Sequence, residues 1–237
     1  MVKVKKINMK KVYILLKYKF ASLIKEFPRI NFFVLNNFRF IKFLLPHDKD
    51  YLGLKLICAN NLNLHIVDIG GNMGSSILSF RSLGLKNKIF VFEPNILLFN
   101  KYLKKLKSKD PNIEIFNYAL GNKNEDKKFY IPFYKNICLH TYSSFDLPFL
   151  QKGLKKSMPK VAVSIQERII KVKKFDNLSF NIKPHLIKID AEGYEIPILK
   201  GMLRSIIEYK PILLIEYNFD SVEEIQSILS KYQAYYY

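Results

Sequence analysis

The chain has 237 residues, of which 49% are hydrophobic and 25% are charged. This length suits one domain with an appendage better than two full domains, and the apolar fraction excludes wholesale disorder. Lysine and arginine number 39 against 20 acidic residues, which gives a formal net charge of +19. Such an excess indicates either an anionic partner or the Lys- and Asn-rich composition that AT-rich coding produces.

Cysteine use and hydropathy indicate an intracellular protein. Cys58 and Cys138 are far apart, and no CxxC or His/Cys cluster predicts a zinc site. Two free thiols in a reducing cytosol are favoured over a disulfide. No run approaches the ~18 apolar residues of a membrane span, and lysines interrupt the basic N-terminus where a signal peptide would be apolar. We therefore expect a cytoplasmic protein.

Residues 1–60 are predicted to form a basic helical extension, separate from a domain at 61–237. Candidate helices cover Lys10–Phe27, 31–45 and 51–60, and proline follows each of the first two. Lysines among apolar residues would suit docking on an anionic membrane, at its inner face. The alternative is a helical cap that packs its apolar face on the following domain.

From residue 61 onward, short apolar strands alternate with helices, which predicts an α/β fold with a parallel sheet. Residues 132–159 lack a clear pattern, and 157–172 show no clear period, so we expect an irregular insertion over a ligand site. The predicted strands are Leu64–Ile69, Lys88–Phe92, Ile113–Ala119, an extra strand at Lys127–Ile131, Leu186–Asp190, Pro211–Tyr217 and a start at Tyr235–Tyr237, and the predicted helices are Ser75–Leu83, Ile96–Leu106, Glu195–Ile207 and Ser221–Lys231.

A glycine-rich turn follows the first strand and contains Asp68, Gly70, Asn72 and Gly74. Ligands of open parallel sheets bind at the carboxyl ends of strands, where glycines permit close backbone approach. The spacing is not GxGxxG, and a carboxylate at Asp68 would repel a pyrophosphate but suit a cationic ligand. A purely structural turn is the alternative.

Glu93 ends the second strand about 20 residues beyond the glycines, where an acidic residue of a Rossmann-like unit contacts ribose hydroxyls. After the third strand, Ala119 would leave room for a flat base and Asn117 would hydrogen-bond it. The P-loop pattern is absent, so nucleotide hydrolysis is disfavoured. Together these residues predict a nucleoside ligand without phosphate contacts, and S-adenosylmethionine fits this description.

The fourth strand ends in candidates for acid–base chemistry: Lys188, Asp190 and Glu192. A hydroxyl acceptor needs a base or a metal, and clustered carboxylates raise one another's pKa. The alternative for Asp190 is a helix cap, and Glu195 is interpreted only as a complement to the helix dipole.

Possible acceptor-binding residues are His140, Ser143 and Ser144 in the predicted insertion and Glu216 in the fifth strand. His140 is an alternative base or a loop residue without a role. Glu216 lies in an apolar run and needs a partner in the cleft or at Lys188. Oxygen ligands from Asp190, Glu192 and Glu216 would suit Mg²⁺, but nothing defines the geometry, so no metal is predicted.

The sequence resembles the FkbM family of methyltransferases over about residues 64–217. The resemblance implies a class I methyltransferase fold, with a Rossmann-like sheet and helices on both faces. It also implies transfer of a methyl group from S-adenosylmethionine to an oxygen, typically a hydroxyl of a sugar or natural product. The motifs that carry the resemblance are VDIGGNMG (Val67–Gly74), FEP (Phe92–Pro94), NYALG (Asn117–Gly121), LIKIDAEGYE (Leu186–Glu195), LKG (Leu199–Gly201) and PILLIEY (Pro211–Tyr217).

Two features depart from the family pattern. Gly71 stands where alanine is common, and only Tyr235–Tyr237 follow the last predicted helix. Class I folds usually end in a β-hairpin, so either the sheet is short at that edge or the chain is truncated.

The leading hypothesis is an O-methyltransferase acting on a glycan or glycolipid intermediate, and the positive charge of the chain would allow this acceptor to be anionic. A nucleic-acid methyltransferase or binder is the second hypothesis, and nucleic acid is disfavoured because the lysines of the N-terminus are far from the motifs in sequence. A non-catalytic, membrane-docked remnant is the third.

Overall fold

The computed structural model describes residues 51, 53–54, 64–216 and 221–235. The predicted basic extension falls almost entirely outside these residues, so its helices and the domain boundary near residue 60 stay predictions. Three residues of that region are described, and two of them, Tyr51 and Leu54, are buried in an apolar cluster with Phe80.

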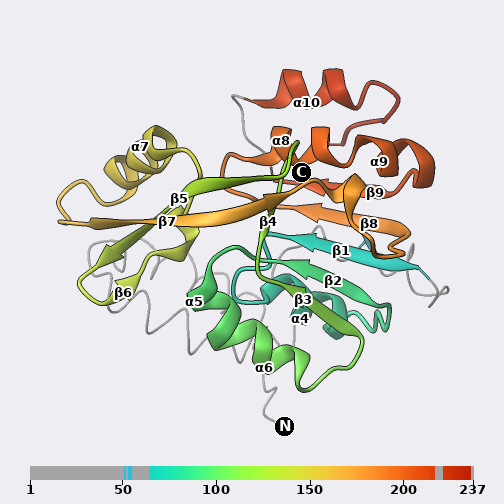
Figure 1. The fold of residues 1–237 in the computed structure, drawn as a ribbon, viewed down its shortest axis with the longest axis horizontal. Coiled ribbons are helices and arrows are strands. Elements are labelled where there is room, and N and C mark those ends of the chain that lie inside the picture. The colour runs from blue at the N-terminus through green and yellow to red at the C-terminus, as the bar shows by residue number, and fades with distance from the viewer. Residues whose placement is uncertain (1–50, 52, 55–63, 217–220, 236–237) are drawn as a thin grey trace, which may run out of the picture.

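A five-stranded parallel sheet forms the centre of the fold, in the order β3-β2-β1-β8-β9 (Figure 1). The order reverses between β1 and β8, which is the switch point where open α/β sheets bind ligands. The sheet therefore confirms the predicted Rossmann-like architecture. Its strands are β1 (His65–Ile69), β2 (Ile89–Phe92), β3 (Ile113–Phe116), β8 (Pro184–Ile189) and β9 (Ile212–Ile215).

Helices cover both faces of this sheet (Figure 1). Alternate residues of β1 divide between two apolar clusters: Val67 packs in the cluster that holds Ile198 of α8, and Ile66 in the cluster that holds Ile77 of α4. The helical segments are α4 (Ser75–Ser82), α5 (Ile96–Leu98), the π-helical turn η3 (Phe99–Leu103), α6 (Lys104–Lys107), α8 (Glu195–Gly201), α9 (Leu203–Tyr209), α10 (Val222–Ile228) and the short turn η5 (Phe175–Asn177).

The prediction that this insertion is irregular is wrong, because residues 119–173 form a second sheet and a helix. β5 and β7 pair antiparallel over nine residue pairs, and the sheet order is β4-β7-β5-β6. Most of β7 is exposed, including Ile169, so its side chains show no apolar alternation. The elements are β4 (Ala119–Leu120), β5 (Glu125–Tyr134), β6 (Ile137–Cys138), the 3₁₀ turn η4 (His140–Tyr142), α7 (Leu147–Ser157) and β7 (Ser164–Lys173).

Three predicted elements have different bounds. The third strand ends at Phe116, and Ala119 belongs to the second sheet. The helix predicted at 195–207 is two helices, because the Asp176 carboxylate accepts the N–H groups of Arg204 and Ser205 and so caps a new helix. Tyr235 is not in a strand, and residues 236–237 lie outside the described part.

The two sheets meet where the backbone of one approaches a glycine of the other. A Cβ on Gly201 at the end of α8 would lie 1.9 Å from the carbonyl oxygen of Gly121, just after β4. Gly121 itself would meet Val172 of β7 at 2.6 Å. Both motif glycines therefore permit this close packing, which brings the second sheet over the carboxyl ends of the first.

Candidate active site

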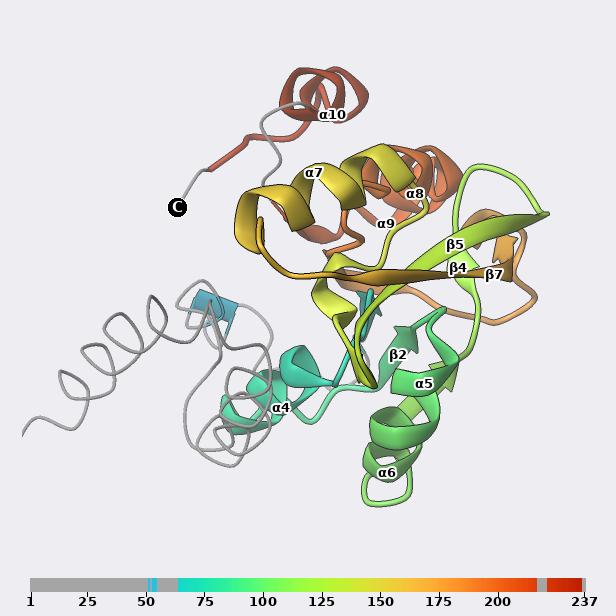
Figure 2. The same ribbon diagram turned by 90° about the vertical axis from the view of Figure 1, so that its left-hand side faces the viewer.

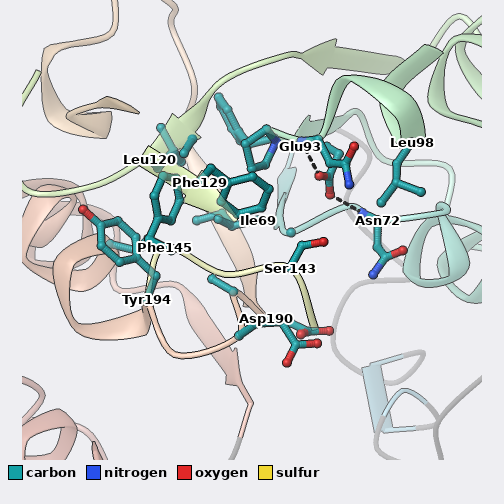
Figure 3. A pocket seen from close by; sticks show the side chains of 18 of the residues that line it. Ile69, Asn72, Glu93, Leu98, Leu120, Phe129, Ser143, Phe145, Asp190 and Tyr194 are labelled. Carbon is teal, nitrogen blue, oxygen red and sulfur yellow. Dashed lines mark hydrogen bonds between the residues drawn. The ribbon is translucent and has the colours of Figure 1, made fainter. Parts of the chain in front are cut away.

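A cavity lies at the carboxyl ends of β1, β2 and β8 and is covered by the second sheet and η4 (Figure 3). The register aligns these ends, because Ile69 pairs with both Phe92 and Ile189. The empty space is about 580 Å³, and part of it is open to solvent. Its polar lining comes from Gly70, Asn72, Glu93, Asn95, His140, Ser143, Asp190 and Glu192.

The glycine turn after β1 packs directly on the strand end that carries Asp190. Gly70 has φ +78°, and a Cβ there would lie 1.8 Å from the carbonyl oxygen of Asp190. The N–H groups of Gly70 and Gly71 both donate to the carbonyl of Phe92. Gly70 is therefore required by its backbone conformation and by close contact with its neighbour.

Glu93 links the glycine turn to the loop after β2. One carboxylate oxygen accepts the N–H of Asn72 at 2.7 Å and the other accepts the N–H of Asn95 at 2.7 Å. Burial of this 5% exposed residue raises the pKa of Glu93 to about 7, although both hydrogen bonds oppose the shift. Each oxygen keeps a lone pair that could accept a ligand hydroxyl.

Two further polar atoms of the cavity find no hydrogen-bond partner among the described residues: Oγ of Ser143 and Oδ1 of Asn72. Ser143 is 7% exposed and lies between the Glu93 side and the Asp190 side of the cavity (Figure 3). A buried polar atom without a partner is costly, so both oxygens are suited to bind polar groups of a ligand.

Asp68 and Lys188 lie beneath the cavity and do not line it. Asp68 is fully buried, and one of its oxygens accepts the Ser76 hydroxyl. The Lys188 ammonium contacts Asp68 at 3.4 Å and Asp190 at 3.0 Å, and donates to the Gly70 carbonyl at 3.1 Å. These two carboxylates raise the pKa of Lys188 against the effect of its burial, so it remains charged. Lys188 therefore orients Asp190 and the glycine turn.

The loop from Asp190 to Gly193 is held by contacts from two directions. Oε1 of Glu195 accepts the N–H groups of Ala191 at 3.0 Å and Gly193 at 3.2 Å. The Ser144 hydroxyl donates to the Glu192 carbonyl at 2.8 Å. Glu192 has φ +50°, a conformation that costs energy for a residue with a side chain, so these contacts maintain its position.

Burial raises the pKa of Glu192 to about 9, and the charges of Glu216 and Asp190 add to the shift. The free chain therefore holds a proton on this side chain at neutral pH. The N–H of Glu216 donates to the Ile189 carbonyl at the end of the neighbouring strand. The acids after β8 and β9 consequently influence one another, as their clustering predicts.

Aromatic side chains form the apolar wall of the cavity. The ring centroids of Phe129 and Phe145 are 4.8 Å apart, and those of Phe145 and Tyr194 are 4.6 Å apart. The three side chains come from β5, the residue before the α7 cap, and the start of α8. Ala119 and Leu120 of β4 complete this wall.

The structure brings eight of the fourteen predicted site residues to the cavity lining: Gly70, Asn72, Glu93, Ala119, His140, Ser143, Asp190 and Glu192. The other predicted residues lie outside the lining and make structural contacts there. Gly74 packs on Leu106, and Asn117 donates to the carbonyls of Glu93 and Pro94. The six residues outside the lining are Asp68, Gly74, Asn117, Ser144, Lys188 and Glu216.

Sequence reasoning missed the apolar lining and the two contacts that hold the Glu192 loop. Phe129, Phe145 and Tyr194 have no local signal because they come from separate elements. The start of α7 did have a local sequence signal, because an aspartate followed by Leu-Pro is typical of a helix N-terminus. In the structure, the Asp146 carboxylate accepts the N–H of Phe149 and caps this helix.

The described residues contain neither a metal-binding cluster nor a membrane-spanning helix. Within residues 64–216 and 221–235, together with the three described positions before them, no group of three His, Cys, Asp or Glu side chains is placed to hold a metal ion. Over the same part of the chain, no helix has the length and apolar character needed to cross a bilayer.

Comparison with known protein families identifies the fold's relatives. The methyltransferase FkbM domain matches residues 68–236, which is most of the chain. This chain belongs to the FkbM methyltransferase family. No curated protein matches it.

Two solved structures resemble this FkbM domain. The methyltransferase FkbM from Methylobacillus flagellatus KT has a TM-score of 0.48 and 21% identity, over 71% of this chain and 37% of that one. The precorrin-6y C5,15-methyltransferase from Geobacter metallireducens GS-15 has a TM-score of 0.41 and 14% identity, over 79% and 72%. The chain therefore spans just over a third of the first protein's length.

Proposed function

We propose that this FkbM domain transfers a methyl group from S-adenosylmethionine to a hydroxyl oxygen of a sugar, glycan or glycolipid. The observation that carries the proposal is the cavity at the switch point, with Glu93 on one side and Asp190 and Glu192 on the other. Glu93 suits the hydroxyl donors of a nucleoside, and the acids on the other side suit a nearby positive charge.

The cavity residues fit this cofactor. Glu93 could accept ribose hydroxyls, while the partnerless oxygens of Asn72 and Ser143 could bind other polar groups. The bound cofactor would supply a methyl group on a sulfonium, whose sulfur leaves as a neutral thioether when the methyl is transferred. The chain must then position the acceptor oxygen and remove its proton.

Glu192 is the proposed general base, with Asp190 beside it held by Lys188. A cationic ligand next to these acids would lower the pKa of Glu192 from about 9 toward neutrality. The carboxylate would then accept the hydroxyl proton. His140 and Ser143 lie on the η4 side of the cavity and are the proposed acceptor contacts.

Product analysis tests this function. The full chain is incubated with methyl-labelled cofactor and extracted surface glycans or glycolipids, and the methylated product is identified. We expect Glu192→Gln to reduce kcat at least about 100-fold, the range for loss of a general base. Cofactor affinity by calorimetry should stay within a few-fold, because Gln resembles the protonated side chain.

Glu223→Gln is the matched control, since this acid is exposed on α10. Normal turnover by Glu192→Gln would refute the base assignment. If the wild type does not bind the cofactor, the protein is non-catalytic and the proposed function is wrong. If the methyl label appears in RNA and not in a glycan, the proposed acceptor is wrong.

A further inference from the structure

Two helical segments beside the cavity carry lysines without acids. Figure 2 looks onto the carboxyl ends of the parallel strands, with α7 above them and α5 and α6 below. Leu98 of α5 lines the cavity, as does Phe145 just before α7. No acidic residue occurs at positions 94–109 or 147–166.

The exposed lysines of these segments lie on α7 and on α6, which continues the helical segment that begins beside the cavity at Ile96. Six lysines of α6, the turn after it and α7 are exposed: Lys104, Lys105, Lys109, Lys152, Lys155 and Lys156. Like charges at this spacing repel one another and so favour an anionic partner. This arrangement accounts for part of the excess of +19.

Exposed aliphatic side chains stand at the start of α5. Ile96 is 41% exposed and Leu97 is 46% exposed, directly between the cavity residues Asn95 and Leu98. Asn95 caps this helix by accepting the N–H of Leu97, so the two side chains are held in a defined position. They are not needed for core packing.

Exposed aliphatic residues next to lysines are typical of segments that lie in the interface of an anionic bilayer. Binding to single-stranded nucleic acid would instead call for exposed aromatic side chains, on which bases stack. The exposed large apolar residues at this rim are aliphatic. A lipid surface therefore accounts for both the charge and the apolar residues.

We propose that this rim, defined as Ile96, Leu97, Lys104, Lys105 and Lys155, docks the protein on an anionic phospholipid surface. Docking would turn the cavity toward the lipid headgroups. An acceptor hydroxyl carried on a lipid would then reach the acids after β8, a consequence that rests on the proposed function. The docking itself needs no methyl transfer and is measured without cofactor.

Sedimentation of the full chain with lipid vesicles tests the docking. One set contains phosphatidylcholine alone, and the other contains about one-third phosphatidylserine. Binding is expected only to the second set, and it should weaken as salt rises, because salt screens surface charges. The triple variant Lys104→Glu/Lys105→Glu/Lys155→Glu should bind at least about tenfold more weakly, since each basic residue near such a surface contributes several-fold.

The control triple variant Lys86→Glu/Lys183→Glu/Lys210→Glu makes the same charge change where the parallel strands begin, away from the cavity at their carboxyl ends. These three lysines are exposed and precede β2, β8 and β9. It should retain most of the binding. Equal losses in the two triple variants would overturn the proposal, because net charge alone would then explain binding.

A second pair of variants tests the apolar part of the rim. Ile96→Ser/Leu97→Ser should weaken vesicle binding several-fold, whereas Ile169→Ser/Ile207→Ser should not, although the latter side chains are 61% and 62% exposed. Binding to RNA or heparin but not to vesicles would refute the lipid assignment. Normal cofactor binding by the rim variants keeps this test separate from the proposed methyl transfer.

Discussion

Glu93 connects two loops of the fold and is also the proposed contact for ribose hydroxyls. Its carboxylate joins two loops by accepting the N–H groups of Asn72 and Asn95, and it is almost fully buried. An ionised carboxylate in such a place loses solvation that two hydrogen bonds only partly replace. The stability of the protein should therefore depend on the protonation of this residue.

The pKa of Glu93 is raised from 4.5 to about 7 by burial, so the folded chain holds this proton more tightly than the unfolded chain. Stability is then lost as pH rises from about 4.5 to 7, by about 3 kcal/mol for a shift of this size. Chemical denaturation across pH 4.5–8 should show a flatter profile for Glu93→Gln than for wild type. Parallel profiles would show that Glu93 does not titrate in this way.

At the scale of elements, η4 and the second sheet are connected to the loop after β8. Ser144 is 1% exposed, pairs with Tyr130 of β5 through its backbone, and donates its hydroxyl to the Glu192 carbonyl. Glu195 holds the same loop from α8. Ser144 was predicted to bind substrate; because it lies outside the cavity lining, we propose that it positions this loop.

Isosteric variants test this positioning role. Ser144→Thr keeps the hydroxyl donor, whereas Ser144→Val has the same shape without it. We expect Val to lower kcat about tenfold relative to Thr, because small misplacements of a catalytic group are costly. Cofactor affinity should be equal in both, and the pH–rate profile of Val should shift as Glu192 moves. Equal kcat values and profiles for Thr and Val would exclude the contact from catalysis.

At the scale of the whole molecule, the cavity belongs to both sheets. Ile69 and Glu93 come from the parallel sheet, while Ala119 and Phe129 come from the second sheet. The Gly121–Gly201 contact keeps the sheets close. A ligand in this cavity should therefore stabilise the two sheets together.

Hydrogen exchange with S-adenosylhomocysteine tests this coupling. At about 100 times its Kd, a ligand that binds only the folded state adds about 2.7 kcal/mol of stability. We expect added protection in residues 69–74 and 190–195 and also in β4, β5 and η4. A surface peptide such as α10 should change only as far as global stability requires. Protection confined to the parallel sheet would show that the second sheet does not enclose the ligand.

The parallel strands, the glycine turn and the acids that follow β2 and β8 were predictable because their signals are local. A short β-rich run followed by glycine or an acid determines where a strand ends, and a parallel sheet places those ends at one edge. Glu93, Asp190 and Glu192 were found in this way.

Tertiary structure decided the features whose partners are distant in sequence. The second sheet depends on antiparallel pairing of β5 with an exposed β7, which has no periodic signal. Asp176 starts α9 from 28 residues away. Asp68 and Lys188, predicted in the site, neutralise each other beneath it, because a buried charge needs a partner and the fold supplies that partner across two strands.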